Sequence, residues 1–227
     1  MNCLIFDDIH LNIHMHKFLF STIISCLLLF TSCITIEESY SFKEDGSGSS
    51  SFVINMSQMK KIMETMTGAI EASEPATFSA MDFNVYKDTL SKTEGISNIN
   101  TKLDNINYQF ELTYDFSSKE ALNNAMNIIF ESKSQVFFNY KKKDFELTHP
   151  LPQLINNELK DMSSEQTTMF LEAVKYNITL NFERPIKKTT TTAVKSISED
   201  KKQLVLETNL DELIKTPDKF HTRIKLK

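Results

Sequence analysis

The sequence predicts an α+β fold, in which one or more antiparallel sheets carry amphipathic helices on one face. Three observations lead to this prediction. Several short segments alternate apolar and polar residues, which is typical of half-buried strands. Other segments place apolar residues three or four positions apart, as amphipathic helices do. The two kinds of segment follow one another in a strand–strand–helix order that recurs without a shared residue pattern, so we expect a structural rhythm and not a sequence repeat.

The first strand is predicted over residues 34–42, whose apolar residues share one parity, with Glu38 as the single exception. Asp45-Gly46-Ser47-Gly48 follows and supplies residues that tolerate positive φ. Alternation resumes at Phe52 and continues to Met56. The segment therefore predicts a β-hairpin.

A methionine-rich helix is expected next. Ser57 can cap it through its hydroxyl group, and the apolar residues that follow recur at helical spacing: Met59, Ile62, Met63, Met66 and Ile70. Met59, Met63 and Met66 are the ligand-binding candidates of the chain, because flexible thioethers adapt to an acyl chain or a partner helix. Ordinary core packing is the alternative for this face. A loop over 72–80 and a short helix over 85–90, ending at Gly95, complete the segment.

The middle of the chain predicts a second hairpin and a helix. The hairpin covers residues 96–116 and turns near Asp104-Asn105. Ser117 and Glu120 have the spacing of a capping box, in which each side chain satisfies a free backbone N–H. The helix that it opens has one apolar face, formed by Leu122, Ala125, Met126 and Ile129.

The last part of the chain predicts mainly strands. Pro150 and Pro152 punctuate it, and Ser163 and Gln166 open a helix that reaches Val174. Strands are expected over 136–140, 145–148, 178–182, 190–197, 203–207 and 220–226, with a short helix over 210–214. One body over 33–227, or two subdomains divided near 150–162, are both compatible with this order.

The N-terminus has the features of a secretory signal. A basic start at Met15-His16-Lys17 precedes thirteen uncharged residues, Phe18–Phe30, and two small residues before Cys33. The run is too short for a transmembrane helix, which needs about 20 apolar residues. Residues 1–32 are therefore predicted to be a signal peptide. Translation is expected to begin at Met15, because Asp7 and Asp8 are unsuited to a basic n-region.

Phe30-Thr31-Ser32-Cys33 resembles the lipobox of bacterial lipoproteins, although that family usually has Leu where this chain has Phe30. The resemblance implies cleavage between Ser32 and Cys33 and a diacylglyceryl group on the Cys33 thiol. It also implies a chain attached by lipid to the inner or outer membrane of the cell envelope, facing the periplasm or the cell surface. A chain that begins at Cys33 has no second cysteine and therefore no intramolecular disulfide.

The order of features is also similar to that of LppM-type lipoproteins and their relatives of unknown function. The residues that carry this resemblance are Cys33 running directly into a strand, Asp45-Gly46-Ser47-Gly48, Ser57 at the start of its helix, and the strand at Leu204-Val205-Leu206. The resemblance implies an envelope protein with an α+β domain and no established catalytic residues.

The net charge of the chain argues against some classes of partner. The chain has a formal net charge of −5, with both signs mixed along the sequence. This balance argues against nucleic acid, which requires a basic face, and it predicts no polybasic patch for anionic lipids. Membrane attachment is then expected through covalent acyl chains, of which two or more anchor a protein stably.

No sequence motif predicts a catalytic, metal or cofactor site. His149 and His221 lie outside any H-E-x-x-H or Cys-x-x-Cys pattern, and His149 is expected to be solvated. Gly46-Ser47-Gly48-Ser49 is not the G-x-S-x-G of hydrolases, and no phosphate-binding G-x-x-x-x-G-K is present. Glu37, Glu38 and Asp82 are expected to be solvated carboxylates.

Two further patterns are weak. Asp45, Ser47 and Ser49 offer too few charged oxygens for calcium. Asn177-Ile178-Thr179 matches a glycosylation acceptor but falls within a predicted strand.

Three functions are compatible with the sequence. The first is a non-catalytic binding or scaffolding lipoprotein that contacts other envelope proteins. The second is a lipid- or glycolipid-binding module with an apolar groove along the methionine-rich helix. The third is an unrecognised hydrolase, for which no catalytic constellation is visible.

Overall fold

The computed structural model describes residues 34–58, 83–132, 134–149, 168 and 171–227. The predicted signal peptide, the lipidation and cleavage residues Ser32 and Cys33, and Met59, Met63 and Met66 lie outside the described residues, as do the predicted loop at 72–80 and the helix opened by Ser163. The elements in chain order are β1 Ile34–Phe42, β2 Gly48–Asn55, α3 Phe83–Ser91, β3 Ile96–Asp104, β4 Gln109–Phe116, α4 Lys119–Ile129, β5 Phe138–Lys141, β6 Asp144–Leu147, β7 Val174–Phe182, β8 Ile186–Thr189, β9 Val194–Ile197, β10 Gln203–Asn209, α7 Leu210–Lys215, the 3₁₀ turn η2 Pro217–Lys219 and β11 Thr222–Leu226.

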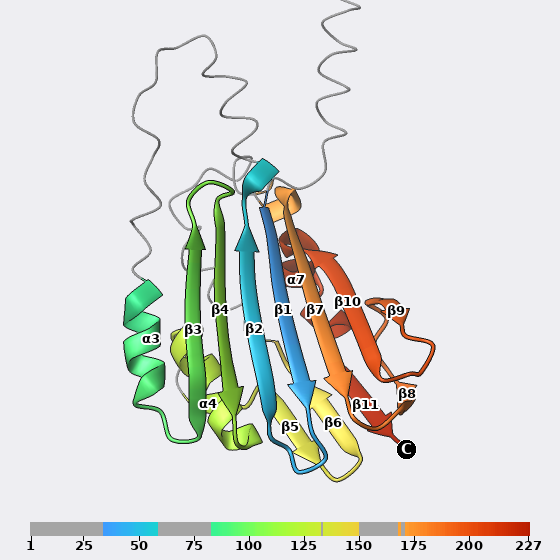
Figure 1. Ribbon diagram of the computed structural model, residues 1–227. Helices are drawn as coiled ribbons and strands as arrows, with labels where there is room; N and C mark the ends of the chain where they lie inside the picture. The colour runs from blue at the N-terminus through green and yellow to red at the C-terminus, as the bar shows by residue number, and fades with distance from the viewer. Residues whose placement is uncertain (1–33, 59–82, 133, 150–167, 169–170) are drawn as a thin grey trace, which may run out of the picture. The chain divides into compact units, whose positions relative to one another are not determined.

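The strands form two sheets (Figure 1). The larger has seven strands in the order β3-β4-β2-β1-β7-β10-β9, and the smaller has four in the order β5-β6-β11-β8. β1 and β7 pair in parallel, so the larger sheet is mixed and the expectation of a purely antiparallel sheet is wrong. The alternation of residues within a strand reports which face is buried and carries no information about the direction of its neighbour. Both sheets also combine strands from before and after residues 150–162.

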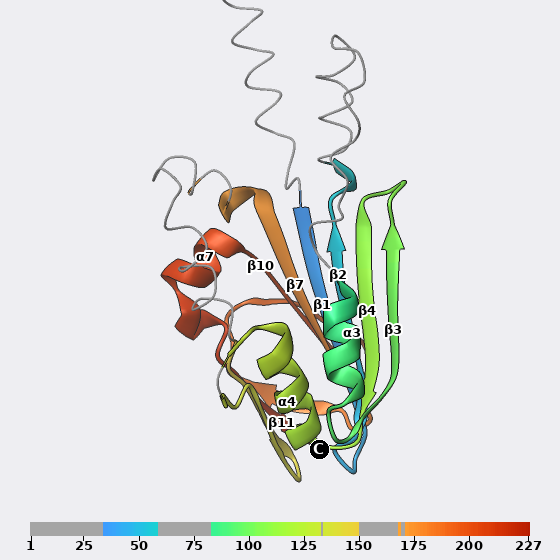
Figure 2. The ribbon, with the colours of Figure 1, turned by 90° about the vertical axis from the view of Figure 1, so that its left-hand side faces the viewer.

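The molecule has two layers over the described residues (Figure 2). The seven-stranded sheet is one layer, and the four-stranded sheet, α4 and α7 lie on one of its faces. No described element covers the other face, which Figure 1 presents to the viewer. An α+β class describes this arrangement, with more strands than helices. No described helix is long and apolar enough to span a membrane.

An aromatic core joins the two sheets. β4 and β7 alternate buried and half-buried residues along their whole lengths, as the sequence predicted. Phe42, at the end of β1, is in ring contact with residues from both layers: Phe145 at 5.0 Å, Phe182 at 5.6 Å, Phe116 at 5.7 Å and Phe138 at 5.8 Å between centroids. Burying an aromatic side chain of this kind contributes roughly 1.5–3 kcal/mol.

The first hairpin is confirmed, and Gly48 explains its tightness. Gly46 has φ of +87°, as the predicted turn requires. Gly48 pairs with Phe42, and a Cβ atom at this position would lie 1.8 Å from the carbonyl oxygen of Ser41. Any side chain at position 48 would therefore force the two strands apart.

Asparagine side chains tie α4 to the segment that enters β5. The Asn123 Oδ1 atom accepts hydrogen bonds from the backbone N–H groups of Phe137 and Phe138, at 2.7 and 2.9 Å. Its Nδ2 atom donates to the carbonyl of Phe138 at 2.8 Å. Asn127 bonds to the backbone of Gln135 through both its amide atoms. These side-chain amides provide hydrogen-bond partners for backbone groups at the entry to β5.

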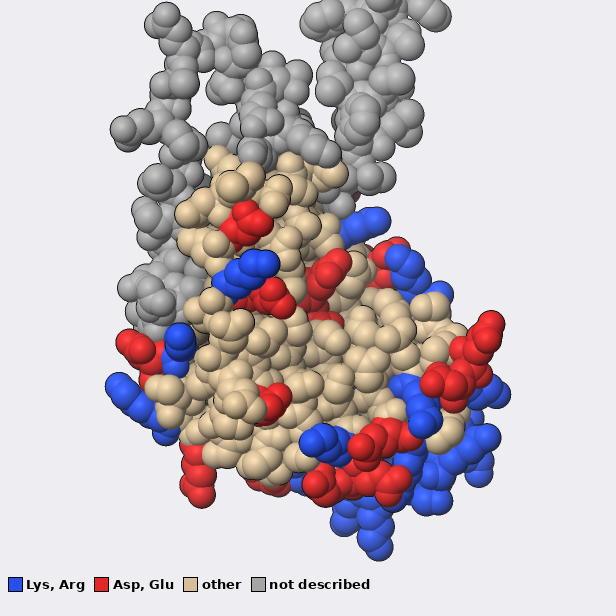
Figure 3. Space-filling model, viewed as in Figure 1, with Lys and Arg blue, Asp and Glu red and all other residues tan. Residues whose placement is uncertain are grey.

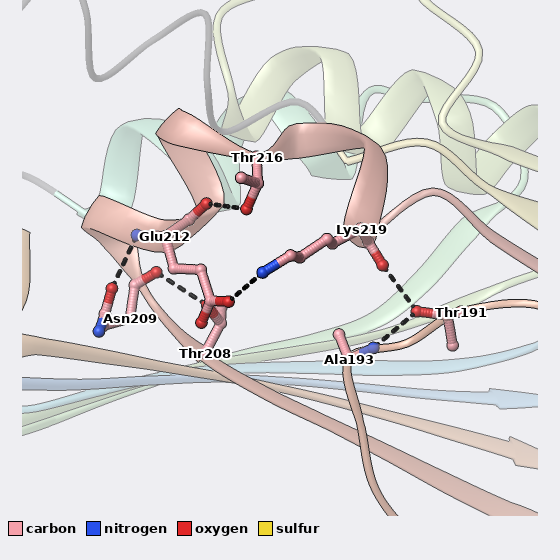
Figure 4. A network of polar contacts seen from close by, with 7 residues as sticks. All are labelled: Thr191, Ala193, Thr208, Asn209, Glu212, Thr216 and Lys219. Atoms are coloured by element: carbon pink, nitrogen blue, oxygen red, sulfur yellow. Dashed lines mark hydrogen bonds and ion pairs between the residues drawn. The ribbon is translucent and has the colours of Figure 1, made fainter.

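A polar network secures α7 over the larger sheet (Figure 4). The Asn209 side chain caps the helix by accepting from the Glu212 N–H at 2.8 Å. The Glu212 carboxylate pairs with Lys219 Nζ at 2.9 Å, and the Lys219 carbonyl accepts from the Thr191 hydroxyl at 2.8 Å. Thr191 in turn accepts from the N–H of Ala193. The network connects α7 and η2 to the loop between β8 and β9.

Several predicted boundaries are corrected by the structure. The capping residue of α4 is Ser118, whose Oγ accepts from the Ala121 N–H at 3.1 Å, and not Ser117. Val174 begins β7 and does not end a helix. β8 was not predicted, because its four residues alternate too briefly to be recognised. The second hairpin, α3, α7 and the strand pair β5–β6 are confirmed.

Candidate functional site

A carboxylate lies inside the core, beneath the centre of the larger sheet. Glu38 of β1 is 1% exposed. Its Oε2 atom accepts a hydrogen bond from Tyr40 Oη at 2.8 Å, and its Oε1 atom accepts a short one from Tyr176 Oη. His149 Nε2 lies 3.2 Å from Glu38 Oε2 and 2.9 Å from Tyr176 Oη. We refer to Glu38, Tyr40, His149 and Tyr176 as the Glu38 cluster.

The parallel pairing of β1 with β7 assembles this cluster. Ile36 is in register with Tyr176, so the side chains of Glu38 and Tyr176 project from neighbouring strands to the same face. Tyr40 lies two residues beyond Glu38 on that face. His149 follows β6 and is held by ring contacts with Tyr176 and Phe130, at centroid distances of 5.1 and 6.0 Å.

Met126 and Tyr114 lie beside the cluster. Tyr40 Oη also lies 3.2 Å from the sulfur of Met126, and Tyr114 Oη lies 4.0 Å from the same atom. Burial raises the pKa of Tyr40 and of Tyr176 well above the ordinary value, and the negative charge of Glu38 raises both further. Burial likewise raises the pKa of Tyr114, against the opposing effect of its hydrogen bond with Ser50.

The expectation that Glu38 and His149 are solvated is wrong. The side chains of Glu38 and His149 are 1% and 2% exposed, with His149 Nε2 at 3.2 Å from Glu38 Oε2. A signal for Glu38 was present in the sequence, because it shares the parity of Ile36 and Tyr40 and must point inward if they do. No local signal marks His149, since its burial depends on strands that are far away along the chain.

A carboxylate, an imidazole and a phenol within hydrogen-bond distance could exchange a proton. Each of these groups, however, already bonds to another member of the Glu38 cluster, and both Glu38 and His149 are enclosed. A buried charge of this kind is tolerated when its oxygens are fully hydrogen-bonded. The arrangement therefore suits a structural role in fixing β1 against β7 and the segment after β6.

The other residues considered from the sequence do not converge on one site. Glu37 is exposed, and Asp45 Oδ1 accepts from both the N–H and the hydroxyl of Ser47, within the turn. His221 Nε2 pairs with Glu146 Oε1 at 2.7 Å. Asp82 lies outside the described residues. Within the part of the chain that the structure describes, no group of three or more His, Cys, Asp or Glu could hold a metal ion.

The face of the larger sheet that no described element covers carries few charges (Figure 3). Hydroxyl and amide side chains line its two hollows, of about 650 and 320 Å³. The residues concerned include Ser39, Ser41, Ser49, Ser51, Asn177, Thr179 and Asn181. The predicted glycosylation acceptor Asn177 is thus within β7 on this face.

The smaller sheet, in contrast, gathers positive charge. Its exposed cationic side chains come from three separate segments: Lys141, Lys142 and Lys143; Lys187 and Lys188; and Arg223, Lys225 and Lys227. Only two carboxylates, Asp144 and Glu146, belong to its strands. We call this surface the basic face. Cationic side chains therefore outnumber carboxylates on the strands of the smaller sheet, although both signs are mixed along the sequence.

Glu38 is expected to be essential for stability. Glu38→Ala would leave the buried hydroxyls of Tyr40 and Tyr176 without their acceptor, and the free energy of unfolding should fall by about 3–5 kcal/mol. Glu38→Gln retains an acceptor oxygen and should lose about 1–3 kcal/mol. Urea denaturation measures both, and Glu37→Ala, at an exposed neighbouring position, should change stability by no more than about 0.5 kcal/mol. Equal stability of Glu38→Ala and Glu37→Ala would contradict the structural role.

Alkaline pH is expected to destabilise the fold through three of the six tyrosines of the chain, Tyr40, Tyr114 and Tyr176, which are buried in the core. The pKa values of Tyr40, Tyr114 and Tyr176 are raised in the folded state, so the unfolded state binds fewer protons above pH ~10. Stability is complete below that pH and falls as pH rises, by about 1.4 kcal/mol per unit for each of the three residues. Tyrosinate absorbance should show these three ionising together with the loss of near-UV circular dichroism. Their ionisation in protein that is still folded would refute this.

No protein-family model matches the chain. No curated protein matches it. Among solved structures, the chain is similar to the folded domain of the LppM protein of Mycobacterium tuberculosis, determined by NMR. The TM-score is 0.43 at 8% sequence identity, and the match covers 86% of this chain and 89% of that chain. This likeness assigns no ligand, partner or activity to the chain.

Proposed function

We propose that this chain is a lipid-anchored, non-catalytic binding module of the cell envelope. The anchor is argued from the sequence: the basic start, the apolar run Phe18–Phe30 and Thr31-Ser32-Cys33 together have the form of a lipoprotein signal. β1 begins at Ile34, directly after Cys33. With no linker between them, the folded body would be held next to the bilayer.

The proposal of a non-catalytic function rests on the burial of the Glu38 cluster. It is the described group that most resembles catalytic machinery, since it joins a carboxylate, a histidine and tyrosines. A general acid or base must come within hydrogen-bond reach of its substrate. Glu38 and His149 are enclosed, and they are in hydrogen-bond contact with one another and with Tyr176. The hydrolase alternative therefore has no support in this geometry, whereas the two exposed sheet faces are available to partners.

The anchor is tested by replacing the thiol. Cys33→Ser should abolish labelling by fatty acid and release the protein from the membrane fraction, because the acyl chains have no other attachment point. Cys26→Ser is the matched control, since Cys26 lies in the segment that would be removed. It should label and fractionate like the parent. Fatty-acid labelling of Cys33→Ser would overturn the proposed anchor and the location in the envelope.

Lipid or glycolipid binding is a second candidate, favoured by one observation. At the start of the larger sheet, the inward-facing residues Ile34, Ile36, Phe52 and Ile54 are only half-buried, although they pack against the core. Apolar side chains left partly open beside a proposed membrane anchor are suited to an acyl chain. Met59, Met63 and Met66 are proposed to complete this surface.

Native mass spectrometry of the full chain tests this candidate. Protein extracted in mild detergent should retain a co-purified lipid whose mass is released on activation. Substituting Ile36 and Ile54 by Ser should remove that lipid, because the acyl chain would lose apolar contact area, whereas Val53→Ser on the opposite face should not. A lipid-free parent mass would eliminate the candidate.

A further inference from the structure

The basic face is built by strand pairing and not by local sequence. In the smaller sheet, Lys225 of β11 is in register with Asp144 of β6 on one side and with Lys188 of β8 on the other. Lys141 of β5 is in register with Asp144. One row across the four strands therefore reads Lys141, Asp144, Lys225 and Lys188. Three of its four side chains are cationic, although the chain as a whole has a net charge of −5.

Asp144 is the only carboxylate in this row, where it lies between Lys141 and Lys225. Within the described residues, Lys141, Lys188 and Lys225 form no ion pair, whereas Arg223 and His221 both pair with Glu146. Like charges placed directly opposite each other in a sheet, such as Lys188 and Lys225, are destabilising. An external anion would relieve this repulsion.

The basic face also has a hollow. A depression of about 320 Å³ lies over the sheet, and four cationic side chains and two carboxylates line it: Lys141, Lys188, Arg223 and Lys225, with Asp144 and Glu146. Neighbouring strands lie ~5 Å apart, so the cations are distributed along a surface and do not converge on one point. This distribution suits an anion whose charges repeat along a chain better than a single small ion.

With β1 upright on the proposed anchor, the basic face would lie far from the anchoring bilayer. Tyr140, beside Lys141, is in ring contact with Phe42 at the far end of β1 from Ile34, with 6.1 Å between centroids. Figure 3 shows Lys and Arg, interspersed with Asp and Glu, at the lower right, at the end where β8 and β11 lie in Figure 1. The nine residues of β1 rise roughly 30 Å at ~3.3 Å each. The Debye length is about 8 Å at physiological ionic strength, so charge at that bilayer is screened.

We propose that the basic face binds a linear polyanion that carries a phosphate on each repeating unit and lies away from the anchoring membrane. This inference deepens the proposed binding function and rests on it for the orientation. Lysine ammonium groups bind phosphates as point charges, and a flexible chain can place successive phosphates over Lys141, Lys225 and Lys188. Affinity arises from charge neutralisation, so it must weaken steeply with added salt.

Binding of long-chain inorganic polyphosphate tests the proposal. The full chain is reconstituted in nanodiscs of uncharged phosphatidylcholine, and affinity is measured over a range of salt concentrations. The triple variant Lys141→Gln, Lys188→Gln and Lys225→Gln should bind at least tenfold more weakly. Its slope of log affinity against log salt should be smaller by roughly two, as expected for three lost phosphate contacts on a single-stranded polymer.

A matched control removes the same charge elsewhere. Lys87→Gln, Lys102→Gln and Lys202→Gln change three exposed lysines outside the smaller sheet and should leave polyphosphate binding within twofold of the parent. Circular dichroism checks that both triple variants fold. Equal losses in the two triple variants, or parent-like binding of the first, would overturn the proposal. So would tighter binding to vesicles of anionic phospholipid, or to duplex DNA, than to polyphosphate.

The Cys33→Ser chain separates this inference from the proposed anchor. Purified without lipid, it should still bind polyphosphate as the parent does, because the basic face is built from β5, β6, β8 and β11. Failure of the basic face would appear as weak polyphosphate binding by the parent with normal labelling. Failure of the anchor would appear as unaltered fractionation of Cys33→Ser with normal polyphosphate binding.

Discussion

The pairing of β1 with its two neighbours is the interaction on which the rest of the structure depends. β1 lies between β2, which the chain reaches through a short turn, and β7, which lies more than a hundred residues further along. Its inward face carries Glu38, Tyr40 and Phe42, and these three side chains reach both layers of the molecule. A one-residue slip of β1 would turn all three toward solvent. The parallel register with β7 therefore determines the core.

Burial of Glu38 reinforces that register. An aliphatic residue at this position would fit the alternation of the strand, but it would tolerate several neighbours equally well. A carboxylate that must be satisfied by Tyr40, Tyr176 and His149 accepts only the arrangement that brings them together. Buried polar groups confer this kind of specificity in some proteins, and the aromatic packing around Phe42 supplies the bulk of the apolar contact.

The elements that could be predicted from the sequence are those with a clear local periodicity. The hairpins, α3, α4 and α7 were predicted because alternation, helical spacing and capping residues are properties of short segments. The parallel pairing of β1 with β7 could not be predicted, since alternation is indifferent to strand direction. The same reasoning applies to the sites: Glu38 was visible as an exception in parity, whereas His149 reaches it only through the folded chain. The basic face could not be predicted, because its lysines lie in separate segments that are brought together only when β6 and β8 pair with β11.

Direct entry of the chain into β1 has a mechanical consequence. Tension on the N-terminal end of β1 is applied along the strand, and the hydrogen bonds to β2 and β7 run across it. Those bonds would be loaded in shear, all together, and could not be peeled apart one at a time. If the chain is anchored through Cys33 as proposed, its folded body would resist pulling at the anchor better than a body attached through a strand at the edge of the sheet.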